Sequence, residues 1–155
     1  MKTISEYLST DHKRCDQLFA TAEHSVDQGN WKQAKAAFQH FSESQLHHLT
    51  MEETILFPAF ENATGNTHGP TSVMCAEHKQ MLGIMQQMDD AIAEQHASNF
   101  FGCAETLNIL LQQHNMKEES MLYPMTDRAL SSKCHEIIDA MDHIDRVIAS
   151  LDKVD

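Results

Sequence analysis

An eleven-residue phrase occurs twice in this chain, and the repeat limits what the chain can fold into. HLTMEETILFP spans residues 48–58 and HNMKEESMLYP spans residues 114–124, an offset of 66 residues (114 − 48 = 66). The same offset relates Asp11-His12-Lys13 to Glu77-His78-Lys79. The sequence is therefore an internal duplication in which each half places a histidine 36 residues before a His-x-x-x-Glu pair.

Apolar residues in both halves recur in steps of three and four, which is the core stripe of an amphipathic helix. The two stripes of the first half are Leu8, His12, Cys15, Phe19, Ala22 and Val26, then Ala34, Phe38, Phe41, Gln45, His48, Glu52 and Ile55. Both stripes recur 66 residues later in the second half, where the position equivalent to Ile55 is Met121. The histidines and the glutamates of the repeat thus fall on buried helix faces.

Turn signals divide the chain into helices. Thr3 with Glu6 resembles a capping box, Gly29-Asn30 separates the first two helices, and the run 61–70 is a loop between the halves. Thr71 and Ser98 are candidate caps, and the third helix is expected to end near His96. Pro58 and Pro124 are expected to end or kink their helices.

These helices predict an all-α fold in one domain, residues 1–155. Few Gly (5) and Pro (3) residues and 6% aromatics support helix over β structure. Short turns within each hairpin favour an up-down-up-down four-helix bundle over about residues 4–126. A fifth, C-terminal helix over about 131–152 carries apolar residues along one side, for packing on the bundle or against a second copy.

Antiparallel pairing brings the repeated residues to one level of the bundle. His12 lies about 16 residues before the first hairpin turn and His48 about 18 after it, so each is roughly 25 Å from the turn at ~1.5 Å per residue. The same count applies to His78 and His114. The predicted metal ligands converging on this level are His12, His48, Glu52, His78, His114 and Glu118.

Two buried carboxylates without a basic residue in the stripe require another source of positive charge, which metal cations would supply. Four imidazoles and two carboxylates suit iron, manganese or zinc. The twofold pattern favours two metals, with Glu52 and Glu118 as the bridges between them. Two bridged metal ions typically lie ~3.5–4 Å apart. Such a site has room for an oxo or hydroxo bridge and for an open position that binds a small molecule.

These residues resemble the hemerythrin-like (HHE cation-binding) family of non-haem di-iron four-helix bundles, over about residues 5–126. The resemblance rests on His12, His48-x-x-x-Glu52, His78 and His114-x-x-x-Glu118 with their LFP and LYP tails. It implies two iron ions held by these six residues, with manganese or zinc as alternatives. Oxygen carriers of the family have a His-x-x-x-His in the third helix, whereas here Met74 and Leu82 flank His78 at that spacing.

Three functions follow as hypotheses. The first is a binding protein for O₂, NO or peroxide, or one that senses or buffers iron. The second is a di-iron enzyme that reduces peroxide or NO, or that contributes to repair of iron centres under nitrosative or oxidative stress. The third is a structural zinc protein, which would be colourless. No catalytic residue is assigned. The only candidates for moving a proton beside the site are Tyr123, His47, Glu53 and Glu119.

Other histidines and the overall charge add expectations about surroundings and partners. His47 is a candidate seventh ligand or rim residue, Glu53 and Glu119 are solvated charges or partners of ligand imidazoles, and Tyr123 packs in the core or hydrogen-bonds a ligand. The net charge of −12 without a Lys/Arg cluster argues against nucleic acid and anionic membranes. No apolar run approaches a membrane span, so we expect a cytoplasmic monomer or homodimer.

Overall fold

The computed structural model describes the backbone of residues 2–152 and the side-chain surroundings of residues 2–144. Within this range the chain is helical and has no strand. The long helices are α1 (Ile4–Asp27), α2 (Trp31–Met51), α4 (Pro70–Ala93), α5 (Ala97–Lys117) and α7 (Cys134–Asp152). The short helices are α3 (Phe57–Thr64) and α6 (Tyr123–Ala129), and residues 131–133 form a 3₁₀ turn. In the described part of the chain, no helix has the length and apolar character that crossing a bilayer requires.

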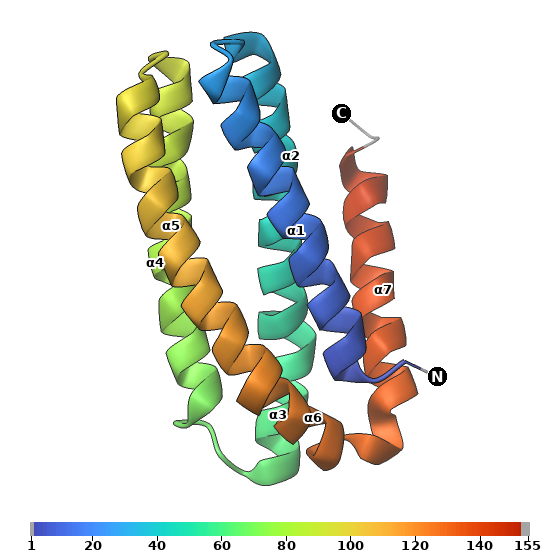
Figure 1. The fold of residues 1–155 in the computed structure, drawn as a ribbon. Helices are drawn as coiled ribbons and strands as arrows, with labels where there is room; N and C mark the ends of the chain where they lie inside the picture. The colour runs from blue at the N-terminus through green and yellow to red at the C-terminus, as the bar shows by residue number, and fades with distance from the viewer. Residues whose placement is uncertain (1, 153–155) are drawn as a thin grey trace.

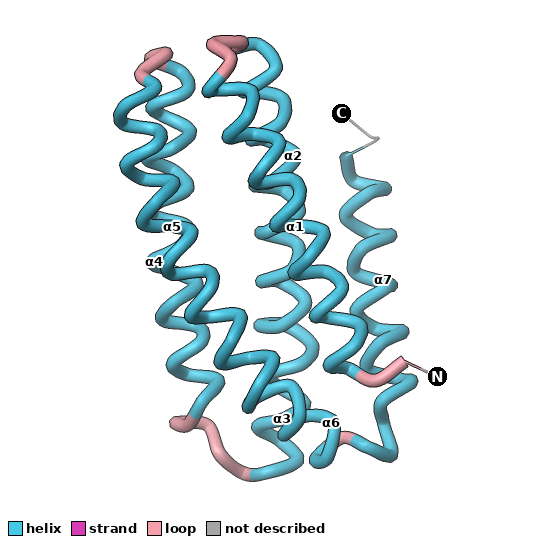
Figure 2. The backbone as a smooth tube through the Cα atoms, viewed as in Figure 1, coloured by secondary structure: helices cyan, strands magenta, loops and turns pink. Residues whose placement is uncertain are grey.

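The helices form the predicted up-down-up-down bundle. Helices α1 and α2 make one antiparallel hairpin and α4 and α5 make the other, with both hairpin turns at the same end (Figure 1). Helices α3 and α6 lie together at the opposite end, beside the start of α1 (Figure 1). The loops are confined to the two ends, so the middle of the bundle is helical on every side (Figure 2).

The first hairpin begins and turns where the sequence predicts. The Thr3 hydroxyl accepts a hydrogen bond from the Glu6 N–H at 3.0 Å, and the Glu6 carboxylate accepts one from the Thr3 N–H at 3.1 Å. This is the reciprocal capping box. Gly29 has a φ of +69°, which a residue without Cβ adopts at low cost, and the Asn30 side chain caps α2.

Four predicted boundaries around the second hairpin were wrong. The loop is shorter than 61–70, because α3 continues to Thr64 and ends at Gly65 in a left-handed conformation. Thr71 does not cap α4; its hydroxyl donates to the Glu61 carboxylate at 2.7 Å instead. Helix α4 ends at Ala93 rather than near His96, and the ring of His96, not Ser98, caps α5.

The helices that carry the repeated glutamates change pitch directly after the ligand layer. Glu52–Leu56 and Glu118–Leu122 are π-helical, and the carbonyls of Glu52 and Glu118 accept hydrogen bonds from the N–H groups five residues on. Pro58 and Pro124 follow within the first turn of α3 and α6. Since proline has no N–H to donate into the preceding turn, the ladder is rearranged there rather than broken.

Each π segment adds one residue to the turn and shifts the buried stripe. The sequence stripe placed Ile55 and Met121 in the core; Ile55 is half-buried against the apolar cluster beyond the layer, but Met121 is 63% exposed. Leu56 and Leu122 are buried in their place. An α-helical period of 3.6 residues cannot continue through a segment whose hydrogen bonds span five residues. The predicted stripes are therefore correct up to the glutamates and wrong by one residue beyond them.

Two apolar clusters fill the bundle on either side of the ligand layer. The cluster on the hairpin-turn side includes Phe19, Phe38, Phe41, Met88 and Phe100. The cluster at the other end includes Ile4, Leu8, Leu56, Phe60 and Leu122. Burying each of these side chains contributes about 1.5–3 kcal/mol to folding. The polar layer between them is thus held at a fixed depth by packing from both sides.

The fifth predicted helix packs on its own bundle. Ile137 and Met141 of α7 are buried in the cluster beside α1 and the π segment after α2. Helix α7 lies alongside α1 and α2 in Figure 1. The predicted apolar positions Val147, Ile148 and Leu151 lie outside the residues whose side chains are described.

Candidate metal centre

Four helices each contribute to one buried layer at mid-bundle. His12 comes from α1, His78 from α4, the His48/Glu52 pair from α2 and its π segment, and the His114/Glu118 pair from α5 and its π segment. Each of the six side chains is at most 5% exposed. The structure thus brings together all six residues that the repeat singled out. We refer to them as the ligand layer.

The ligand layer divides into two groups of donor atoms that could hold metal ions. One consists of Glu52, His78, His114 and Glu118, and the other of His12, His48 and Glu118. Within each group the donor atoms lie within 4.8 Å of one another. Glu118 belongs to both groups, as a carboxylate between two ions would. His47 belongs to neither group, which does not support it as a seventh ligand.

The imidazoles point the same ring nitrogen toward the carboxylates. His12 Nε2 lies 3.1 Å from Glu118 Oε1, and His114 Nε2 lies 3.3 Å from that atom. Across the layer, Glu52 Oε1 lies 3.3 Å from the Nε2 of His78 and 3.5 Å from the Nε2 of His48. All four Nε2 atoms therefore face the interior of the layer.

A second ring of carboxylates holds the outer nitrogens of the four imidazoles. His48 Nδ1 and His114 Nδ1 each lie 2.8 Å from a carboxylate oxygen, of Asp11 and Glu77 respectively. The other two contacts are His78 with Glu53 at 3.1 Å and His12 with Glu119 at 3.3 Å. A carboxylate at Nδ1 fixes the tautomer that leaves Nε2 free for a metal. We call Asp11, Glu53, Glu77 and Glu119 the outer carboxylates.

The outer carboxylates were only partly anticipated. The sequence predicts that Glu53 and Glu119 are either solvated charges or partners of the ligand imidazoles. The structure shows both properties, since each carboxylate contacts a histidine and each side chain is about 40% exposed. Asp11 and Glu77 were not assigned a role. The signal was present in the sequence, because each acidic residue directly precedes a ligand histidine and the two are related by the 66-residue offset.

Replacing Asp11 by alanine is expected to weaken metal binding about 10–100-fold while leaving all six layer residues in place. The reason is that His48 loses the acceptor that orients its ring. Competition titration against a chromophoric chelator measures the change. Asp89→Ala, at an exposed position of α4, is the charge-matched control, and equal affinities of the two variants would contradict this role for Asp11.

Tyr123 lies inside the ligand layer, in addition to packing in the core. Its hydroxyl donates to Glu52 Oε2 at 2.8 Å and also contacts Glu118 Oε1 at 3.0 Å. The Nε2 atoms of His12 and His48 lie 3.1 and 3.3 Å from the Tyr123 hydroxyl oxygen. The position related to Tyr123 by the duplication is Phe57, which stacks on His78 and has no hydroxyl. The two halves of the layer are therefore chemically different.

Tyr123→Phe is expected to destabilise the metal-free protein by about 1–3 kcal/mol, because a buried Glu52 oxygen loses its hydrogen-bond donor. Chemical denaturation of the stripped protein measures this loss. Tyr7→Phe removes a half-buried phenol hydrogen bond outside the layer, from the Tyr7 hydroxyl to the Asp142 carboxylate at 2.5 Å, and serves as the comparison. If the metal-free Tyr123→Phe variant matched the wild type in stability, the Tyr123–Glu52 bond would have no energetic role.

Protonation in the layer shows how costly the two carboxylates are without cations. Burial, with the charge of Glu118, raises the pKa of Glu52. Burial also acts to raise the pKa of Glu118, but the neighbouring Glu52 carboxyl and the close imidazoles of His114 and His12 outweigh it and lower that pKa. Burial acts to lower the pKa of His12, yet its hydrogen bond to Glu118 and the nearby charges of Glu118 and Glu52 raise it to about 9. The pKa values of the two glutamates are thus shifted in opposite directions, since burial disfavours the charge on Glu52 while the imidazoles favour the charge on Glu118.

Four buried atoms of the layer have no hydrogen-bond partner among the described residues: Glu52 Oε1, His78 Nε2, His114 Nε2 and Glu118 Oε2. Glu52 Oε1 and His78 Nε2 approach to 3.3 Å without hydrogen-bond alignment. Buried polar atoms are normally satisfied. All four belong to one donor group, so a cation among them would complete their bonding. The nitrogen and oxygen donors present therefore fit a metal.

The remaining histidines are peripheral. Apart from the buried His47, they are exposed: His24, His40, His68, His96, His135 and His143. A third group of possible donors, Glu53, Cys75 and His78, lies at the edge of the layer and uses an outer carboxylate and a half-buried thiol.

Fold and site together define a helical bundle with a buried histidine–carboxylate layer that could hold metal ions. Residues 3–126 match the family described as hemerythrin HHE cation binding domain. The chain therefore belongs to the hemerythrin family of cation-binding domains, as its sequence motifs suggested. No curated protein and no solved structure matches the chain.

Proposed function

We propose that this protein is a non-haem di-iron protein that binds a small diatomic or oxidant ligand, such as O₂, NO or peroxide, or that senses or buffers iron. The observation that supports it is the pair of donor groups sharing Glu118 at the centre of the bundle. Four imidazoles and two carboxylates suit iron, and family membership favours iron over manganese or zinc. In this proposal the predicted ligands are the six residues of the ligand layer.

An iron pair supplies a redox-active centre with positions open to a small molecule. The protein's own residues determine what such a molecule meets. The Tyr123 hydroxyl, at the same level as the four Nε2 atoms, can donate a hydrogen bond to a ligand on the His12/His48 side. Phe57 offers the His78 side only an apolar ring. Ligand binding is therefore expected to favour the His12/His48 side.

The second candidate is a di-iron enzyme that reduces peroxide or NO, or that acts in iron-centre repair. It is favoured by the placement of two groups that the sequence offered as candidates for moving a proton. Tyr123 in the layer and the 40%-exposed Glu119 on His12 Nδ1 place two proton-carrying groups on one side of the site. Proton delivery of this kind is what such a reduction requires.

Metal analysis and absorption spectroscopy of protein purified from iron-supplemented cells test the proposal. The expected result is about two iron ions per chain, as a shared carboxylate implies, with near-ultraviolet absorption of a ferric pair. A colourless, redox-silent zinc protein would contradict it. Stopped-flow mixing of the reduced protein with O₂, NO and peroxide then separates the candidates, because a reversible adduct supports binding and multiple turnovers support an enzyme.

A further inference from the structure

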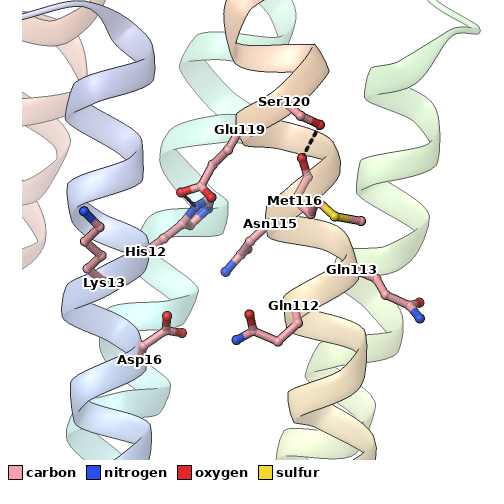
Figure 3. A pocket seen from close by; sticks show the side chains of 9 residues that line it. All are labelled: His12, Lys13, Asp16, Gln112, Gln113, Asn115, Met116, Glu119 and Ser120. Atoms are coloured by element: carbon pink, nitrogen blue, oxygen red, sulfur yellow. Dashed lines mark hydrogen bonds and ion pairs between the residues drawn. The ribbon is translucent and has the colours of Figure 1, made fainter.

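A surface cavity of about 680 Å³ lies between α1 and α5 and reaches the ligand layer. His12, one of the six layer residues, forms part of its lining. Asp16 of α1 and Gln112 and Asn115 of α5 point into the space between the two helices (Figure 3). The Glu119 side chain extends from α5 to His12 beside them (Figure 3). The cavity is thus lined by polar groups from the surface to a predicted metal ligand.

The duplication provides an internal comparison for this lining. The positions equivalent to Asp16, Gln112 and Asn115 are leucines on the opposite side of the bundle: Leu82, Leu46 and Leu49. Leu49 is buried where Asn115 is half-buried. The lysines Lys13 and Lys79 occur on both sides, so they do not distinguish them. The positions equivalent by the duplication therefore carry a carboxylate and two amides on one side of the bundle and three leucines on the other.

The opposite side has a cavity that does not reach the layer. It has a volume of about 400 Å³ and lies between α2 and α4, next to Leu46 and Leu82. Glu43 and Asp89 also line it, so acidic residues alone do not distinguish the two cavities. None of the six layer residues lines this cavity, whereas His12 lines the one between α1 and α5. The two cavities therefore differ in their access to the layer.

We propose that the α1–α5 cavity is the entry route by which divalent cations reach the ligand layer, with Asp16 and Glu119 as transient ligands. This inference rests on the proposed metal-binding function. The charge of the lining favours cations, because the carboxylates of Asp16 and Glu119 outnumber the ammonium group of Lys13, and a cleft with net negative charge concentrates cations. Asp16 lies one helical turn from His12 on α1, and Glu119, in the π segment after α5, follows Asn115 by four residues, so each pair shares a face.

Glu119 connects the two ends of this route. Its carboxylate contacts His12 Nδ1 at 3.3 Å, while 40% of its side chain stays exposed to the solvent at the cavity. A cation held by Asp16 and Glu119 is therefore one side chain away from the His12/His48 donor group. The equivalent Glu53 contacts His78 in the same manner, but the position equivalent to Asp16 on that side is Leu82, which has no carboxylate.

The test is the rate at which stripped, full-length protein takes up Co²⁺, followed by visible absorption in a stopped-flow instrument. The Asp16→Leu/Asn115→Leu variant transfers the leucines of the opposite side into the cavity. We expect uptake to slow by about tenfold or more, in the range that focused charge contributes to association rates. The final cobalt content should equal that of the wild type, because all six predicted ligands remain.

The matched control is Asp90→Leu/Asn99→Leu, which makes the same two changes in a surface cavity between α4 and α5 remote from the layer. It should load at the wild-type rate. Asp16→Lys, a single change at an exposed position, keeps the test valid if the leucine variant misfolds, and should slow uptake as well. Wild-type rates in both cavity variants would overturn the route while leaving the proposed function standing. A wild-type protein that takes up no metal would overturn both.

Discussion

Stripping the protein of metal with a chelator is expected to lower its thermal unfolding midpoint by roughly 8–16 °C. A ligand present at 1,000 times its Kd stabilises the native state by about 4 kcal/mol, and each kcal/mol shifts the midpoint of a chain of this size by roughly 2–4 °C. The physical cause lies in the ligand layer, where cations would satisfy the four unpartnered atoms and offset the charge of the glutamates. Differential scanning calorimetry of loaded and stripped protein measures the shift.

Adding the metal back should restore the original midpoint, which separates loss of the ion from damage by the chelator. Equal midpoints for loaded and stripped protein would mean that the ligand layer does not depend on a cation. That result would count against the metal as the counter-charge of the buried carboxylates, whatever the metal content of the preparation.

Glu52→Gln is expected to abolish tight metal binding without destabilising the metal-free protein. Burial raises the pKa of Glu52, which favours the neutral form of this side chain in the stripped protein. Glutamine has the same shape and no charge, so the metal-free midpoint should stay close to that of the stripped wild type. A metal, in contrast, loses a carboxylate from its donor group, which should cost more than the ~10–100-fold effect of an outer partner.

The neighbouring substitution Glu53→Gln is the matched control. It removes a carboxylate one residue away, at a 42%-exposed position that contacts His78 Nδ1. Metal titrations should give weakened but measurable binding for Glu53→Gln and none at the same concentrations for Glu52→Gln. If the two variants bound metal equally well, Glu52 would not be a ligand. In the stripped state, calorimetry of Glu52→Gln also shows whether the carboxyl is neutral, since a large fall in midpoint would argue for an ionised side chain.

The fold was predictable because the duplication and the helical period both indicate two equivalent helical hairpins with buried faces. The spacing of three and four residues identifies the buried face of each helix, and the offset of 66 residues shows that the two hairpins are equivalent. Counting residues from each turn then places His12 beside His48 and His78 beside His114. The structure confirms that these side chains meet in one layer.

What the sequence did not reveal depends on irregular backbone and on contacts between helices. The period of 3.6 residues could not show that Glu52–Leu56 and Glu118–Leu122 are π-helical, so Met121 was placed in the core. The caps of α4 and α5 were missed because Thr71 finds a partner in Glu61 and because His96 acts as the cap in place of a hydroxyl. These outcomes depend on local competition for hydrogen bonds, which a propensity does not contain.

The role of Tyr123 depended on both kinds of information. Its spacing from Glu118 on a regular helix suggested a neighbour roughly a turn away, with packing as the simpler interpretation. The π segment instead carries its hydroxyl back into the layer, within 3.0 Å of Glu118 itself. Asp11 and Glu77 were missed for a different reason, because they meet the imidazoles of another helix.

The π segments also show how each helix accommodates one residue more than a regular α-helix would hold. The hydrogen bond from the Tyr123 N–H to the Glu118 carbonyl takes up the extra residue within one turn, so the helix beyond it keeps its facing. Deleting one residue between Glu118 and Tyr123 would place the tyrosine four residues after the glutamate, on the same face of a regular α-helix. An insertion between His114 and Glu118 has no such relief, because it would turn these two side chains about 100° further apart around the helix axis. The five-residue segments therefore tolerate shortening, whereas the regular turn that carries each His-x-x-x-Glu pair does not tolerate lengthening.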